Sequence, residues 1–123
     1  MFEIHPAAPD KAAVLAAREG LTGAVSAMVL WDKGEESGYI LYRLQKDTVQ
    51  LLACRSVDAD LQEWLVRAAL NAAANRNVVT AVCGDETYLS LLQKLGFIVE
   101  NGCATVSIPD VFNRPCQGCA GGC

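Results

Sequence analysis

The hydrophobic pattern of the chain changes its period between residues 48 and 77. Residues 49–54 form a short apolar run, which predicts a buried strand. The next apolar residues recur every three or four positions and predict an amphipathic helix that ends near residue 77: Leu61, Trp64, Leu65, Ala68 and Ala72. A β-branched run follows at 78–83. A strand–helix–strand unit of this kind predicts two parallel strands joined by a crossover.

The part of the chain before this unit predicts a helix and a meander of strands. An alanine-rich stretch predicts a helix over residues 9–21, with Gly20 or Gly23 marking its exit. The predicted strands lie at residues 2–5, 24–31 and 39–44. Residues 32–38 are polar and contain glycine, so we expect them to form the connection between two of these strands. Short connections between successive strands predict an antiparallel meander.

The part after the unit predicts a third helix and a hairpin. The helix is expected from about residue 84 to Leu95, with Gly96 as its C-cap. The last two predicted strands lie at residues 97–100 and 103–108. Asn101-Gly102 between them predicts a tight hairpin, because both residues tolerate positive φ. No helix or strand is predicted from Pro109 onward.

Composition limits the classes of function. A chain of 123 residues with 52% hydrophobic residues can form a single domain with its own core. The net charge of −4, without a cluster of Lys or Arg, argues against nucleic-acid binding. No apolar run is long enough to cross a bilayer and the first residues do not look like a signal peptide, so we expect no membrane partner and a cytoplasmic location. Cys54 and Cys83 lie within strand patterns and are expected to be small buried hydrophobes.

The order of predicted elements, together with the Leu-Gly-Phe segment at 95–97, resembles the GNAT N-acetyltransferase superfamily. In that family a helix ending in such a segment leads into the last two strands. The resemblance implies an α/β (α+β) fold with a mixed, mostly antiparallel sheet of six to seven strands and about three helices. It divides the chain into a GNAT-like domain at 1–112 and a Cys/Gly-rich C-terminal tail at 113–123. The implied function is acyl-CoA-dependent N-acyl transfer to a small-molecule amine, and a homodimer is left open.

In that family the strand and helix described first form the acetyl-CoA site. A glycine-rich turn there presents backbone N–H groups of the helix start to the pyrophosphate. The resemblance implies the following cofactor-binding residues: Cys54, Arg55, Ser56, Val57, Asp60 and Leu61. The turn contains no glycine, and Asp58 and Asp60, either of which can cap the helix, would repel a phosphate that Arg55 offsets only in part. The sequence therefore predicts unusual or degenerate cofactor binding.

Catalytic residues are harder to assign, and the sequence leaves open whether the protein is an enzyme. The family often places a tyrosine five residues before the phenylalanine, where its hydroxyl can protonate the departing thiolate, but here that position is Leu92. Tyr88, one helical turn earlier, is the candidate acid, and the alternative is a tyrosine that only packs. Glu35, Glu36 and His5 are the candidate bases, although none forms a recognisable pair with a nucleophile.

The C-terminal cysteines suggest a second chemistry. Cys116, Cys119 and Cys123 are separated by glycine-rich spacers, and Cys103 can complete a set of four thiolates. Such a set is typical of zinc or an iron–sulfur cluster. Redox exchange between Cys116 and Cys119 and a terminus with free thiols are the alternatives. A non-catalytic GNAT-like scaffold with this cysteine motif is therefore the alternative to the acyltransferase.

Overall fold

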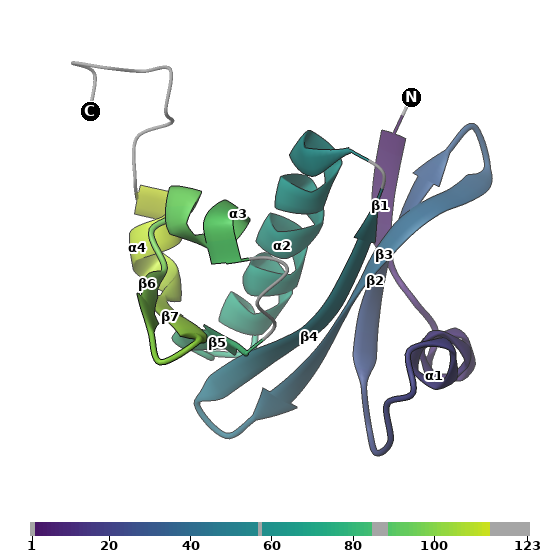
Figure 1. Cartoon of the computed structure of the whole chain (residues 1–123). Helices are drawn as coiled ribbons and strands as arrows, with labels where there is room; N and C mark the ends of the chain where they lie inside the picture. The colour runs from purple at the N-terminus through teal and green to yellow at the C-terminus, as the bar shows by residue number, and fades with distance from the viewer. Residues whose placement is uncertain (1, 57, 85–88, 114–123) are drawn as a thin grey trace.

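A computed structural model of the chain describes residues 2–56, 58–84 and 89–113, which form one seven-stranded sheet flanked by helices (Figure 1). The strand order is β1-β2-β3-β4-β5-β7-β6. Among these neighbours the pair β4–β5 is parallel, and the other five pairs are antiparallel. The predicted mixed, mostly antiparallel sheet is therefore confirmed.

The first half of the chain forms the predicted strand, helix and meander. Its elements are β1 (Phe2–Pro6), α1 (Pro9–Arg18), β2 (Ser26–Asp32), β3 (Glu35–Gln45) and β4 (Thr48–Ser56). The helix α1 ends earlier than predicted, because Gly20 takes a φ of 72° directly after it. The N–H of Leu21 then donates to the carbonyl of Ala16 at 2.9 Å, which closes the helix with a Schellman motif.

The predicted connection at 32–38 is wrong, because most of it belongs to β3. The turn consists of Lys33 and Gly34 alone, with φ values of 54° and 84°, which is the geometry of a type I′ hairpin turn. The strand resumes at Glu35. The pairing of β2 with β3 slips between Leu30 and Trp31, which leaves Ser37 as the extra residue of a β-bulge.

The strand–helix–strand unit is confirmed. It consists of β4, α2 (Ala59–Ala74) and β5 (Thr80–Cys83). Asp58 is the N-cap of α2, as the sequence allowed. At the other end, Asn77 has a φ of 65° and the N–H of Val78 donates to the carbonyl of Ala73 at 3.0 Å.

The second half contains one helix that was not predicted. The elements are α3 (Leu89–Lys94), β6 (Ile98–Glu100), β7 (Cys103–Ser107) and α4 (Ile108–Asn113). Gly96 ends α3 with a φ of 100°, and the hairpin turn at Asn101-Gly102 has both φ values positive, as predicted. Residues 85–88, at the start of the helix predicted to end at Leu95, lie outside the described residues. Pro109 does not prevent the helix α4, because it lies in the first turn, where a backbone N–H has no partner within the helix.

The helices divide the core into two parts. The smaller part lies under α1 and contains Leu15, Val29 and Leu41. The larger part lies on the opposite face, where α2, α3 and α4 cover the sheet (Figure 1). Ile108 and Val111 of α4 are each 1% exposed and belong to the larger part. None of the described helices is long and apolar enough to cross a membrane.

Candidate functional site

The parallel strands β4 and β5 separate part-way along β4. Their pairing covers Thr48 to Leu51 on β4 and ends at Cys83 on β5. Beyond Leu51, β4 continues to Ser56 while pairing only with β3 among the described strands. A β-bulge at Leu52 marks the same position, because Leu41 pairs with Ala53 and Tyr42 with Leu51. Among the described strands, the sheet therefore has a gap beside the part of β4 that follows Leu51.

Apolar side chains fill this gap. They enclose a cavity of about 10 Å³, roughly the space of one water molecule. Its lining comes from β3, β4, α2, β5 and α3: Ile40, Leu51, Leu52, Ala53, Cys54, Val66, Cys83 and Leu92. Leu92 is 1% exposed, so the position at which the family often has a tyrosine is part of the core.

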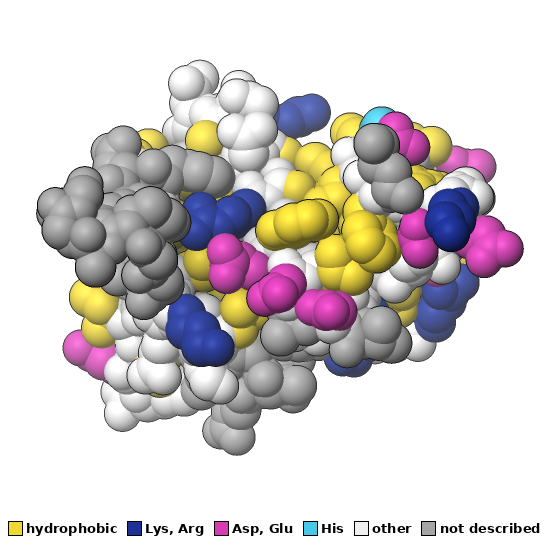
Figure 2. All heavy atoms as spheres, turned by 90° about the horizontal axis from the view of Figure 1, so that it is seen from above, with side chains coloured by type: hydrophobic (Ala, Val, Ile, Leu, Met, Phe, Trp, Pro, Cys, Tyr) yellow, Lys and Arg dark blue, Asp and Glu magenta, His cyan; other side chains and the backbone are white. Residues whose placement is uncertain are grey.

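The start of α2 is closed by its own side chains. The Asp58 carboxylate accepts a hydrogen bond from the N–H of Asp60 at 2.8 Å. The Ser56 hydroxyl accepts one from the N–H of Asp58 at 3.4 Å, and the Gln62 amide donates to the Ser56 carbonyl at 3.0 Å. Figure 2, which looks onto the end of the molecule where α2 begins, shows acidic side chains beside exposed hydrophobic ones. The Asp58 carboxylate thus occupies one first-turn amide and adds negative charge, which disfavours an anion at this helix start.

The side chain of Arg55 lies on the other face of the sheet. It forms a fork with Glu19 at the end of α1, with Nη2–Oε1 at 2.6 Å and Nε–Oε2 at 3.0 Å. The hydroxyl of Tyr39 donates to the same carboxylate. The hydrogen bonds from Arg55 are the main reason that the pKa of Glu19 lies below its usual value. The hydrogen bond from Tyr39 lowers the pKa further, while burial acts in the opposite direction. Arg55 therefore does not offset the acidic residues at the start of α2.

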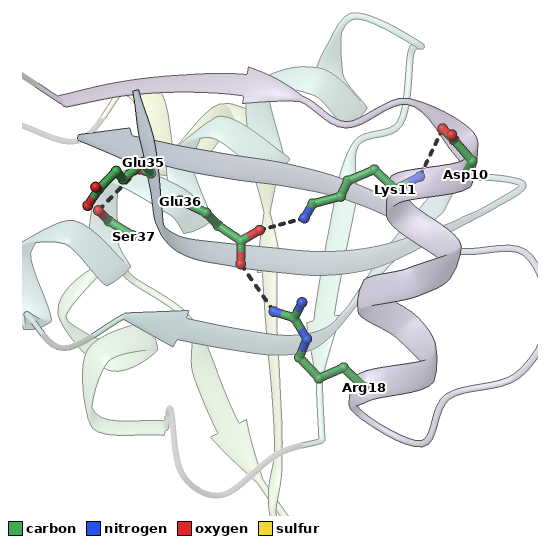
Figure 3. Close-up of polar contacts among 6 residues, drawn as sticks. All are labelled: Asp10, Lys11, Arg18, Glu35, Glu36 and Ser37. Atoms are coloured by element: carbon green, nitrogen blue, oxygen red, sulfur yellow. Dashed lines mark hydrogen bonds and ion pairs between the residues drawn. The ribbon is translucent and has the colours of Figure 1, made fainter. Parts of the chain in front are cut away.

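Glu36 is the centre of a second polar group on the α1 face (Figure 3). Lys11 Nζ lies 2.6 Å from one carboxylate oxygen and Arg18 Nη1 lies 3.1 Å from the other. The hydrogen bond from Lys11 is the main cause that lowers the pKa of Glu36. A carboxylate held by two cations is a poor general base, because it binds a proton weakly. Glu36 also borders an open hollow of about 400 Å³ that includes Gly38, Tyr39 and Arg55.

The sequence alone did not predict the polar groups around Glu19 and Glu36. The pairs Arg55–Glu19 and Lys11–Glu36 join residues 36 and 25 positions apart. Their members look like ordinary exposed charges until the sheet places α1 over β3. The folded arrangement alone brings them together.

Comparison with solved structures identifies the fold, whereas comparison of sequences finds no relative. No protein-family model matches the chain, and no curated protein matches its sequence. A GNAT family acetyltransferase from Elizabethkingia anophelis, solved with acetyl-CoA bound, superposes with a TM-score of 0.65 at 15% identity, covering 86% of this chain and 97% of that one. A GNAT family acetyltransferase from Staphylococcus aureus gives 0.64 at 8% identity, covering 88% and 99%. The PaiA N-acetyltransferase from Thermoplasma acidophilum, in complex with coenzyme A, gives 0.61 at 12% identity, covering 76% and 66%.

The chain has the GNAT fold. The resemblance drawn from the element order and the Leu-Gly-Phe segment is thus confirmed at the level of the fold. Within the described residues, β4 separates from β5 after Leu51 and Asp58 caps the start of α2.

The remaining predicted cofactor residues of the GNAT-like site are placed as follows. Cys54 is buried, and burial raises the pKa of its thiol to about 12, so its side chain serves packing. Leu61 is 8% exposed and packs in the larger core, whereas Asp60 is exposed. Val57 lies outside the described residues, as does the candidate acid Tyr88.

Of the predicted metal ligands, only Cys103 lies in the described part of the chain. Cys103 is exposed at the start of β7. Cys116, Cys119 and Cys123 lie outside the described residues. Within the described residues, no three side chains of the ligand types converge on one point. The zinc or iron–sulfur site therefore stays a prediction.

Proposed function

We propose that this protein is an acyl-CoA-dependent N-acyltransferase of the GNAT fold that binds its acyl donor mainly through the thioester arm. The separation of β4 from β5 after Leu51 carries the proposal, because from there on β4 has a neighbouring strand on one side only among the described strands, and an extended, amide-containing arm would lie along the other side. The structure with acetyl-CoA bound among the similar proteins supports this choice of donor.

The chain's own residues define what such a donor would meet. The arm would lie along β4 beyond Leu51, and the apolar lining around Leu92 would exclude water from the acyl group. The cavity of about 10 Å³ is smaller than an acetyl group, so the side chains of α3 have to shift when the donor binds. The acceptor is a small-molecule amine in this proposal.

Calorimetry with two donors tests the proposal. Acetyl-CoA and S-acetyl-pantetheine share the arm and the thioester, but only the former carries the pyrophosphate and nucleotide. We expect both to bind with affinities within about threefold of each other, because a pyrophosphate gains little at a helix start that carries Asp58 and Asp60. Absence of heat from both donors at millimolar concentration would eliminate the proposal.

A substitution at the helix cap sharpens the test. Asp58→Ser keeps a side chain that caps the helix about equally well but removes the negative charge. We expect acetyl-CoA to bind about fivefold more tightly to this variant, since a charge near a helix start is worth on the order of 1 kcal/mol. S-acetyl-pantetheine should bind as before. Asp47→Ser, an equal loss of charge in the β3–β4 turn, is the matched control and should change neither affinity.

A non-catalytic scaffold is the second candidate. The closed start of α2 and the buried Leu92 favour it, because both stand where the family has functional groups. In this case the proposed function rests on the C-terminal cysteines. Anaerobic purification followed by metal analysis tests it: about one zinc or one cluster per chain, lost in a triple serine variant of Cys116, Cys119 and Cys123, is the expected result. A metal-free protein in which these thiols alkylate freely would contradict it.

A further inference from the structure

A groove lies between α2 and the β1 side of the sheet, away from the separation of β4 and β5. It encloses about 510 Å³, which falls within the roughly 300–1,000 Å³ of small-molecule sites. The apolar part of its lining comes from Ile4, Met28, Ala68 and Ala72. The two alanines keep it open, because α2 turns its smallest side chains toward β1 and β2 at this point.

One end of the groove is polar and positively charged. Asn71, Asn75 and Arg76 line this end, and the described lining contains no acidic side chain although the whole chain has a net charge of −4. The other arginines of the described residues all hold oxygen atoms: Arg18, Arg55 and Arg67 hold glutamates, and Arg43 holds backbone carbonyls. Among the described residues, Arg76 alone of the arginines has no such partner.

Tyr42 supplies a second polar group without a partner. Its side chain lines the groove and the residue is 5% exposed, yet no described residue forms a hydrogen bond with its hydroxyl. Burial raises the pKa of Tyr42, and the nearby charge of Arg76 acts in the opposite direction. The hydroxyl is therefore a neutral donor on a residue that lines the same groove as Arg76, whose charge acts on it.

The C-terminus of α2 does not cancel this charge. Helix carbonyls would repel an anion, but those of Ala73 and Ala74 already accept hydrogen bonds from the N–H groups of Val78 and Asn77, each at 3.0 Å. The positive charge of Arg76 is thus left for a ligand.

We propose that this groove is a binding site for a small amphipathic carboxylate, with the carboxylate on Arg76 and Tyr42 and its apolar body along Met28, Ala68 and Ala72. A guanidinium fork matches the two oxygens of a carboxylate, and the tyrosine hydroxyl adds a donor at the same end. The site is separate from the proposed donor site, so it does not depend on acyl transfer.

Fluorescence titration with 8-anilinonaphthalene-1-sulfonate, an apolar aromatic body with one anionic group, tests the site. We expect one saturable site, displacement of the dye by decanoate but not by decanol, and much weaker binding of the neutral analogue N-phenyl-1-naphthylamine. Saturating acetyl-CoA should leave the dye affinity unchanged. A neutral analogue that binds as tightly as the anionic dye would overturn the assignment.

Variants locate the binding. Arg76→Gln alters an exposed side chain and should weaken dye binding about tenfold, the usual weight of a charge-assisted hydrogen bond. Arg67→Gln removes the same charge from the exposed part of α2 and should leave the affinity unchanged. Ala72→Phe should abolish binding by filling the groove. If Arg76→Gln acts no more strongly than Arg67→Gln, or if Ala72→Phe still binds the dye, the proposal is wrong.

Discussion

Replacing Ile108 by alanine measures how much the final helix contributes to stability. Ile108 is 1% exposed, and its N–H donates to the carbonyl of Val79 at 2.8 Å. The substitution removes about three carbon groups at about 0.8 kcal/mol each, or about 2.5 kcal/mol. The cavity left behind raises the expected cost to about 3–4 kcal/mol. The backbone hydrogen bond survives in the variant, so the loss reports side-chain packing alone.

Ile98→Ala is the matched control, because it makes the same chemical change at a side chain that is 67% exposed on β6. We expect it to cost less than about 1 kcal/mol, chiefly through strand propensity. Urea titrations followed by circular dichroism compare the two variants. With a typical denaturant slope, the midpoint of Ile108→Ala should fall by about 2 M and that of Ile98→Ala by no more than about 0.5 M. Equal shifts would show that α4 is not part of the core.

Three further predictions follow from the described contacts. Glu19→Gln should cost about 1 kcal/mol at neutral pH. Because Arg55 lowers the folded-state pKa of Glu19, this advantage of the wild type should shrink as the pH falls through that lowered value, and melting curves that differ equally in acid would contradict it. Gly38→Ala should cost about 2 kcal/mol in urea titrations, since its Cβ would lie 2.5 Å from the Arg55 carbonyl oxygen. Cys103 should react with iodoacetamide in the native protein, whereas mass spectrometry should find Cys54 modified only after unfolding.

Local signals in the sequence were enough for the elements whose ends depend on single residues. Gly96 after α3 and the Asn101-Gly102 turn act through their own backbone geometry, and the helix cap, which the sequence narrowed to Asp58 or Asp60, is the side chain of Asp58. The parallel pairing of β4 with β5 followed from the helix between them. These features needed no knowledge of distant neighbours.

The failures have physical reasons as well. Lysine rarely takes a positive φ, so the sequence did not predict the two-residue turn at Lys33 and Gly34. The start of β3 was therefore missed. The helix α4 has six residues, too few to show a helical period. The bulge at Leu52 shifts the alternation of β4 by one position and turns the side chain of Arg55 toward α1 instead of α2. An uninterrupted strand would have placed that guanidinium on the cofactor side, as the sequence suggested.

The short pairing of β4 with β5 also has a consequence for the order of folding. Four residue pairs, from Thr48–Thr80 to Leu51–Cys83, make the only pairing that the described strands show between β1–β4 and β5–β7. The meander and the final hairpin can form from contacts between residues that are near in sequence. The pairing of β4 with β5 instead requires closure of a loop that contains α2. In pulse-labelled hydrogen exchange during refolding, the amides of β5 should therefore become protected after those of β2 and β3.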